Sequence, residues 1–115
     1  MSEQNEEEQQ LMQAMGLISN AGNAKSLAIE AVSAAKKGDF DIAQSKMKEA
    51  NDSLVQAHKS QTKMLTQEAQ GHHAKLTLLT VHSQDHLMTA ITFIDLAKEL
   101  IDVYQRLNKV EKSQK

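Results

Sequence analysis

The sequence predicts an all-α protein, an antiparallel three-helix bundle of long helices. The chain of 115 residues contains no proline, so no position is barred from a helix interior. Hydrophobic residues make up 40% of it and aromatic residues only 3%, which leaves Leu, Ile, Val, Ala and Met to form the core. Apolar residues also recur at helical spacing in three long stretches. We expect residues 1–115 to form a single domain.

The composition also argues against several function classes. A net charge of −2 offers no basic face to a phosphate backbone, so nucleic-acid binding is disfavoured. The absence of cysteine removes disulfides, thiolate metal sites and thiol nucleophiles. No apolar run approaches the ~20 residues of a membrane span, and the acidic N-terminus lacks a signal-peptide pattern. We therefore expect a soluble, cytoplasmic protein without direct membrane insertion.

The first helix should follow a polar start and end in a tight turn. Residues 1–10 are nearly all polar and are expected to fray, as are residues 111–115. Beyond them, apolar residues recur near a period of 3.6, at Leu11, Met15, Ile18, Ala21, Ala28, Val32 and Ala35. In Lys36-Lys37-Gly38-Asp39, the lysines suit a helix C-terminus, Gly38 the left-handed residue after it, and Asp39 the next N-cap. Such a turn predicts antiparallel neighbours.

The second helix has a regular apolar seam whose members are spaced alternately by three and four residues. They are Phe40, Ala43, Met47, Ala50, Leu54, Ala57, Gln61 and Met64. Gln61 is the one polar member, and His58 flanks it. Residues 68–73 break the seam around Gly71 and predict a loop, in which His72 and His73 are expected to be exposed.

The third helix is expected from about Lys75 to Val110, and its apolar residues are spread around it. One face carries Leu87, Ile94, Ile101 and Tyr104, a second Phe93, Leu100 and Leu107, and a third Val81, Met88, Leu96 and Val103. A helix that is apolar nearly all round is buried on more than one side. Two partner helices cover only part of it, so we expect self-association through this helix.

This helix also carries the polar cluster of residues 82–86, which permits several kinds of chemistry. His82, Asp85 and His86 are spaced to share one broad helix face. They are suited to bind a metal, although zinc needs further ligands. A hydrolase site lacks a convincing nucleophile, because Ser83 is expected to point away from His82. A neutral imidazole accepts a phosphoryl group where donors hold its oxygens. A hydrogen-bonded polar layer in a helical core is equally compatible.

Several motifs resemble the enzyme IIA component of the lactose/cellobiose (chitobiose) family of the sugar phosphotransferase system. The matching segments are Gly16-Leu17-Ile18, Ala21–Ser26, Lys37–Phe40, Ala57–Thr62 and Val81–Thr89. The resemblance implies a nine-helix homotrimer in which His82 is the phosphorylated residue. It places Asp85 on the trimer axis, where three copies share a divalent metal ion, which we expect to be magnesium. We further expect Gln84 and His86 to assist beside the phosphoryl group.

The function that the resemblance implies is a phosphoryl relay. The histidine phosphocarrier protein delivers the group to His82, which passes it to a cysteine of the cognate enzyme IIB, for uptake of a cellobiose/lactose-type disaccharide. Two alternatives stay open. A histidine phosphotransfer module of a two-component relay is partly matched by His72-His73-Ala74-Lys75, although Leu76 replaces the expected glycine. The other alternative is a non-catalytic helical metal-binding scaffold.

Overall fold

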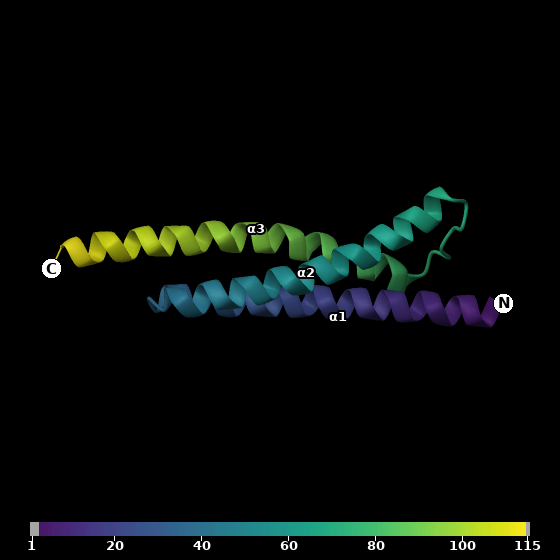
Figure 1. Cartoon of the computed structure of the whole chain (residues 1–115), viewed down its shortest axis with the longest axis horizontal. Coiled ribbons are helices and arrows are strands. Elements are labelled where there is room, and N and C mark those ends of the chain that lie inside the picture. The colour runs from purple at the N-terminus through teal and green to yellow at the C-terminus, as the bar shows by residue number, and fades with distance from the viewer. Residues whose placement is uncertain (1–2, 115) are drawn as a thin grey trace.

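The computed structural model describes residues 3–114, which form three long helices that run antiparallel in succession (Figure 1). They are α1 (Glu3–Lys36), α2 (Phe40–Ala69) and α3 (Leu78–Ser113). The bundle is a rod of 69 × 20 × 20 Å. The predicted all-α fold is confirmed. Residues 3–10 and 111–113 lie in helix, where frayed tails were expected. Of the rest of those expected tails, Gln114 is the C-cap of α3, and residues 1–2 and 115 lie outside the described residues.

Helix α1 packs along both other helices, whereas α2 and α3 contact each other much less. Its buried face consists of Leu17 and a series of alanines, namely Ala14, Ala21, Ala24, Ala28, Ala31, Ala34 and Ala35. Alanine lets neighbouring helices approach closely, since it places only a methyl group between backbones. Leu11 and Met15 belong to the same apolar pattern but are exposed. The alanines, and not these larger residues, therefore form the core face.

The connection between α1 and α2 is the tight turn that the sequence predicts. Gly38 has a φ of 88°, a left-handed conformation in which a Cβ would be strained. The backbone N–H of Asp39 donates to the carbonyl of Ala34 at 2.9 Å and closes the end of α1. Asp39 occupies the N-cap position of α2 as predicted, but its side chain makes no capping hydrogen bond.

The connection between α2 and α3 is longer than predicted and starts later. α2 continues to Ala69, and residues 70–77 form the loop, so α3 begins at Leu78 and not at Lys75. The new start has a physical cause, because Thr77 is a good N-cap. Its Oγ1 accepts a hydrogen bond from the backbone N–H of Thr80 at 3.1 Å.

The first turns of α1 hold this loop in place. The side-chain Oε1 of Gln10 accepts from the backbone N–H of Lys75 at 3.2 Å, and its Nε2 donates to the Lys75 carbonyl. The same amide donates to Oγ1 of Thr80 at 3.1 Å, and Glu7 forms an ion pair with Lys75 at 3.6 Å. Glu7 and Gln10 thus tie the first turns of α1 to the segment that leads into α3.

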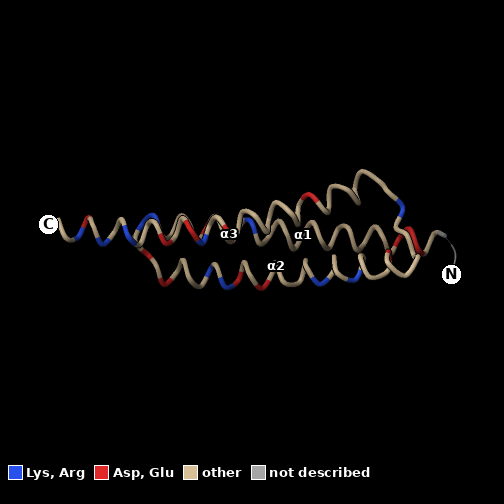
Figure 2. Tube along the Cα trace, turned by 90° about the horizontal axis from the view of Figure 1, so that it is seen from above, with Lys and Arg blue, Asp and Glu red and all other residues tan. Residues whose placement is uncertain are grey.

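Helix α3 presents one face to the core and another to the exterior. Leu87, Ile94 and Ile101 are buried against α1 and α2. An exposed row, here called the outer stripe, consists of Leu78, Val81, Asp85, Met88, Thr92, Leu96, Leu100, Val103, Leu107 and Val110. Charged side chains are sparse along the N-terminal half of α3 (Figure 2). No helix within residues 3–114 has a segment both long and apolar enough to cross a membrane.

Candidate functional site

His82 and His86 form a pair of contacting imidazoles near the start of α3. They are one helical turn apart, and their Nε2 atoms lie 3.1 Å from each other. The ring centroids are separated by 4.4 Å, with an angle of 78° between the ring planes. At this distance one Nε2 donates a hydrogen bond to the other. His82 is exposed and His86 half-buried, so solvent and incoming molecules reach the His82 ring.

The surroundings of His86 favour its neutral form. Burial lowers the pKa of His86, and the charge of Lys25 on α1 and the neighbouring His82 ring lower it further, while Asp85 raises it. Nδ1 of His86 is buried and has no hydrogen-bond partner among the described residues. Lys25 lies within the Ala21–Ser26 motif. Its effect on His86 depends on how α1 packs against α3, which no local sequence pattern indicates.

Ser83 does not act as a nucleophile for His82. Its side chain is fully buried, and its Oγ donates a hydrogen bond to the carbonyl of Thr80 at 2.6 Å. A serine hydroxyl inside a helix commonly donates its hydrogen bond to a backbone carbonyl of the preceding turn. The hydrolase interpretation therefore has no nucleophile in this cluster.

Gln84 points toward α2 and not toward the His82 ring. Its Oε1 accepts a hydrogen bond from Nε2 of Gln61 at 2.8 Å, and its amide nitrogen lies 3.9 Å from the sulfur of Met64. The polar residue in the α2 seam thus finds its partner on α3. Of the two expected helpers, the chain brings only His86 into contact with His82.

Asp85 belongs to the outer stripe and is exposed. Thr89 Oγ1 donates to the backbone carbonyl of Asp85 at 2.7 Å, and this bond does not involve the Asp85 carboxylate. Within residues 3–114, no group of three or more histidine or acidic side chains is arranged to hold a metal ion. A metal bound at Asp85 would need oxygen ligands from outside this chain.

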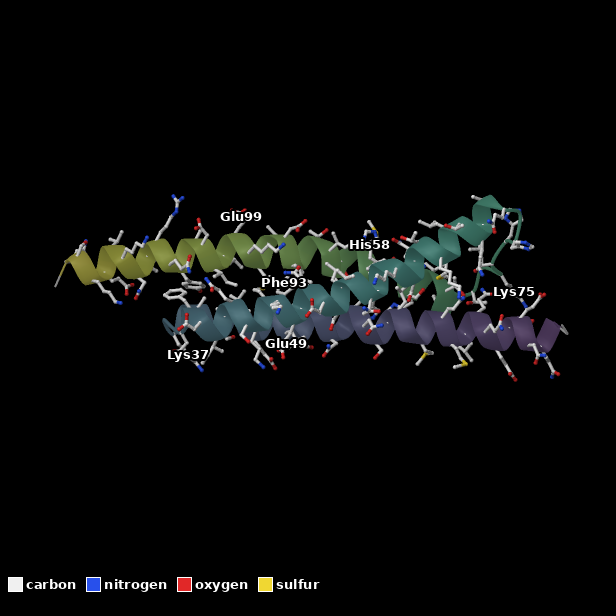
Figure 3. All side chains as sticks on the ribbon, viewed as in Figure 1. Lys37, Glu49, His58, Lys75, Phe93 and Glu99 are labelled. Atoms are coloured by element: carbon white, nitrogen blue, oxygen red, sulfur yellow. The ribbon has the colours of Figure 1, made fainter. Side chains whose placement is uncertain are left out.

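Among the described residues, no hydrogen bond or ring contact links the other three histidines to the pair. His58 is exposed on α2, as Figure 3 shows, and His72 is exposed in the loop. His73 is also exposed, and its Nδ1 lies 2.7 Å from a carboxylate oxygen of Glu68. The His72–Lys75 segment lies in the loop, whereas a two-component phosphotransfer motif belongs within a helix. The position of this segment therefore argues against the two-component phosphotransfer module.

The comparisons with known proteins give a consistent picture. The family model described as "PTS system, Lactose/Cellobiose specific IIA subunit" matches residues 12–105. The chain is 50% identical over 97 residues to the "PTS system cellobiose-specific EIIA component" of Lactococcus lactis subsp. lactis (strain IL1403), covering 84% of each chain.

Two solved structures share the fold at substantial sequence identity. The crystal structure of the cellobiose-specific enzyme IIA from Bacillus anthracis aligns with a TM-score of 0.84 at 41% identity, over 85% of this chain and 90% of that one. An IIA(chitobiose) protein solved in complex with HPr aligns with a TM-score of 0.74 at 39% identity, over 84% and 94% respectively. The chain belongs to the lactose/cellobiose-specific IIA family of the sugar phosphotransferase system, whose members are phosphotransferase components.

Proposed function

We propose that this protein carries a phosphoryl group on His82. The observation that supports this most directly is the exposed His82 imidazole, which the chain holds against a second ring within the family's motif. A neutral imidazole nitrogen with a free lone pair is a competent phosphoryl acceptor. The histidine phosphocarrier protein delivers the group to His82, and a cysteine of the cognate enzyme IIB receives it next.

Leu76, which lies outside the outer stripe, is 84% exposed just before the turn that carries His82 and offers an apolar contact to such protein partners. The related IIA(chitobiose) protein was solved with HPr bound, which supports the histidine phosphocarrier protein as the partner of this chain.

The outer stripe supports a homotrimer with nine helices. Its members are spaced by three or four residues along α3, which is the pattern of a helix that packs against copies of itself. Asp85 and Thr92 are its only polar members. Three stripes meeting on a common axis would bury the apolar residues that the single chain exposes. His82 lies beside the stripe, close to the boundary between subunits in such an assembly.

In that trimer the three Asp85 carboxylates would converge. Like charges in an apolar interface repel strongly unless protons or a cation neutralise them. Carboxylate oxygens suit a divalent ion such as magnesium, completed by water. The ion would supply positive charge that holds the subunits in register. It takes no part in the phosphoryl transfer we propose.

The test is transfer of labelled phosphate from phosphoenolpyruvate through the general phosphotransferase proteins. We expect acid-labile label on the wild-type chain and none on His82→Ala, with an unchanged helical circular dichroism spectrum. His58→Ala and His72→Ala are matched controls that should label normally. Labelling of His82→Ala, or its loss in His72→Ala, would overturn the assignment. Unlabelled wild-type protein would favour the scaffold. The sugar is assigned by finding which of cellobiose, chitobiose and lactose the reconstituted system phosphorylates.

A further inference from the structure

The hydrogen bond between His86 and His82 has a direction, which the buried side of His86 decides. A neutral imidazole carries one N–H. If that proton were on Nδ1 of His86, it would be a buried donor without an acceptor among the described residues. Orphaned buried N–H groups are rare because they lose their hydrogen bond to water without compensation. The proton therefore belongs on Nε2, which lies 3.1 Å from Nε2 of His82.

This direction determines the tautomer of His82. Since its Nε2 accepts the bond, its own proton must be on Nδ1. Only the ring nitrogen without a proton has the lone pair that attacks phosphorus, and here that atom is Nε2. Free histidine prefers the opposite tautomer, with the proton on Nε2. His86 thus opposes the intrinsic preference of the acceptor.

We infer that His86 is a positioning residue that holds His82 in the Nδ1-protonated tautomer and so selects Nε2 as the acceptor atom. The inference rests on the proposed role of His82. During transfer the lone pair of His82 Nε2 forms the new N–P bond while the N–P bond of the donor phosphohistidine breaks. The donor nitrogen keeps that electron pair. No proton moves, because His82 retains its Nδ1–H throughout.

The same N–H has a second use once His82 is phosphorylated. The phosphoryl group then occupies the lone pair to which His86 was donating. His86 Nε2–H is left beside the phosphoryl oxygens, which are strong acceptors. Ser83 Oγ donates to the Thr80 carbonyl, and the Gln84 side chain is directed toward Gln61 and Met64 on α2, so neither contacts the His82 ring. Within this chain's described cluster, His86 is the side chain already in contact with the acceptor ring.

The experiment measures ring ¹⁵N chemical shifts of His82 in the full-length, unphosphorylated protein labelled with ¹⁵N-histidine. In the wild type we expect His82 Nδ1 to be protonated and Nε2 unprotonated. His86→Ala should move the tautomer ratio toward Nε2–H by about fivefold to tenfold, the effect of losing one hydrogen bond. His86→Gln places an amide donor near the lost N–H and should restore much of the ratio. His58→Ala, which alters an exposed histidine on α2, should change nothing.

A wild-type His82 protonated on Nε2 would overturn the inference without any variant. A His82 ratio unchanged in His86→Ala would also overturn it. Phosphoryl labelling of the same proteins separates this failure from that of the proposed function. If wild type labels on His82 but the tautomer is wrong, only the inference about His86 fails. If His82→Ala still labels, the acceptor assignment fails whatever the tautomer.

Discussion

Gln61 on α2 and Gln84 on α3 join by a 2.8 Å hydrogen bond the two helices that contact each other least. Both side chains are half-buried, so water competes only partly for this bond. Without it, the start of α3 would be held mainly from the side of α1. The pair therefore links α3 to α2 at the residue immediately before Asp85 and His86.

This pairing predicts non-additive effects on stability. Gln61→Ala and Gln84→Ala should each lower the free energy of unfolding by about 1 kcal/mol, because each leaves the other amide without its partner. The double variant should lose less than the sum of the two, since the second change removes an interaction that is already gone. Urea unfolding at one fixed protein concentration measures the cycle. Strict additivity would show that the bond contributes nothing in solution.

Replacing the proposed axial carboxylate should remove the metal but keep the trimer. In Asp85→Leu three apolar side chains replace three repelling charges, so trimer stability should be equal or higher. Sedimentation gives the oligomeric state, and elemental analysis gives the bound metal. Asp95→Leu, an exposed aspartate of α3 outside the outer stripe, is the matched control. Monomeric Asp85→Leu would instead make the ion an obligatory link between subunits.

The loop before α3 should weaken in acid. The pKa of Glu68 is lowered from its usual 4.5, first by its hydrogen bond with His73 and then by the backbone N–H of Ala74. A lowered carboxyl pKa contributes stability above the unfolded-state pKa, which is lost as pH falls through the folded-state value. Glu68→Gln should therefore lower the urea midpoint slightly at neutral pH, and the difference should shrink in acid below that value.

The control for that comparison is Glu49→Gln, the same change at an exposed position of α2 away from the loop. Glu49→Gln should shift the urea midpoint little, and about equally at neutral pH and in acid. A constant effect of Glu68→Gln across the pH range would show that the Glu68–His73 contact is not populated in solution.

Two glycines should respond to alanine with opposite signs. Gly38 has a φ of 88°, so Gly38→Ala should destabilise the fold by about 1–2 kcal/mol. Gly16 lies inside α1, and an added Cβ would meet no heavy atom within 4 Å. Gly16→Ala should stabilise by about 0.5–1 kcal/mol, because alanine loses less backbone entropy in a helix. Thermal unfolding compares the two. A destabilised Gly16→Ala would indicate that another subunit or partner packs against that position.

Local chemistry made much of the fold predictable. The α2 seam is buried as its spacing predicts, with Ala43, Met47, Ala50 and Ala57 inside. Gly38 adopts the left-handed conformation expected from its place after two lysines. The start of α3 was predicted too early because the apolar residue Leu76 extends the helical pattern backwards. The N-cap signal of Thr77 was present in the sequence and marks the true boundary.

Other features depend on packing that no local pattern reveals. The Gln84 amide has donor and acceptor groups that suit either the His82 ring or a residue of α2. Only the position of Gln61 on α2 directs it toward that helix. Leu11 and Leu78 look like core residues by type, yet both are exposed. The contact between His82 and His86 follows from their spacing of four. The burial of His86 Nδ1, which gives that contact its direction, depends on how closely the helices approach.

The alanine face of α1 makes this protein unusually intolerant of added volume. Most core mutations in other proteins do harm by leaving cavities, but a methyl side chain leaves little to remove. At Ala21, Ala24 or Ala28, each fully buried, every substitution other than glycine adds atoms where helices already touch. The substitutions that the core accepts should therefore be limited by the distance between the helix axes. Larger side chains should be accepted mainly on the surfaces through which the chain associates with other subunits or proteins.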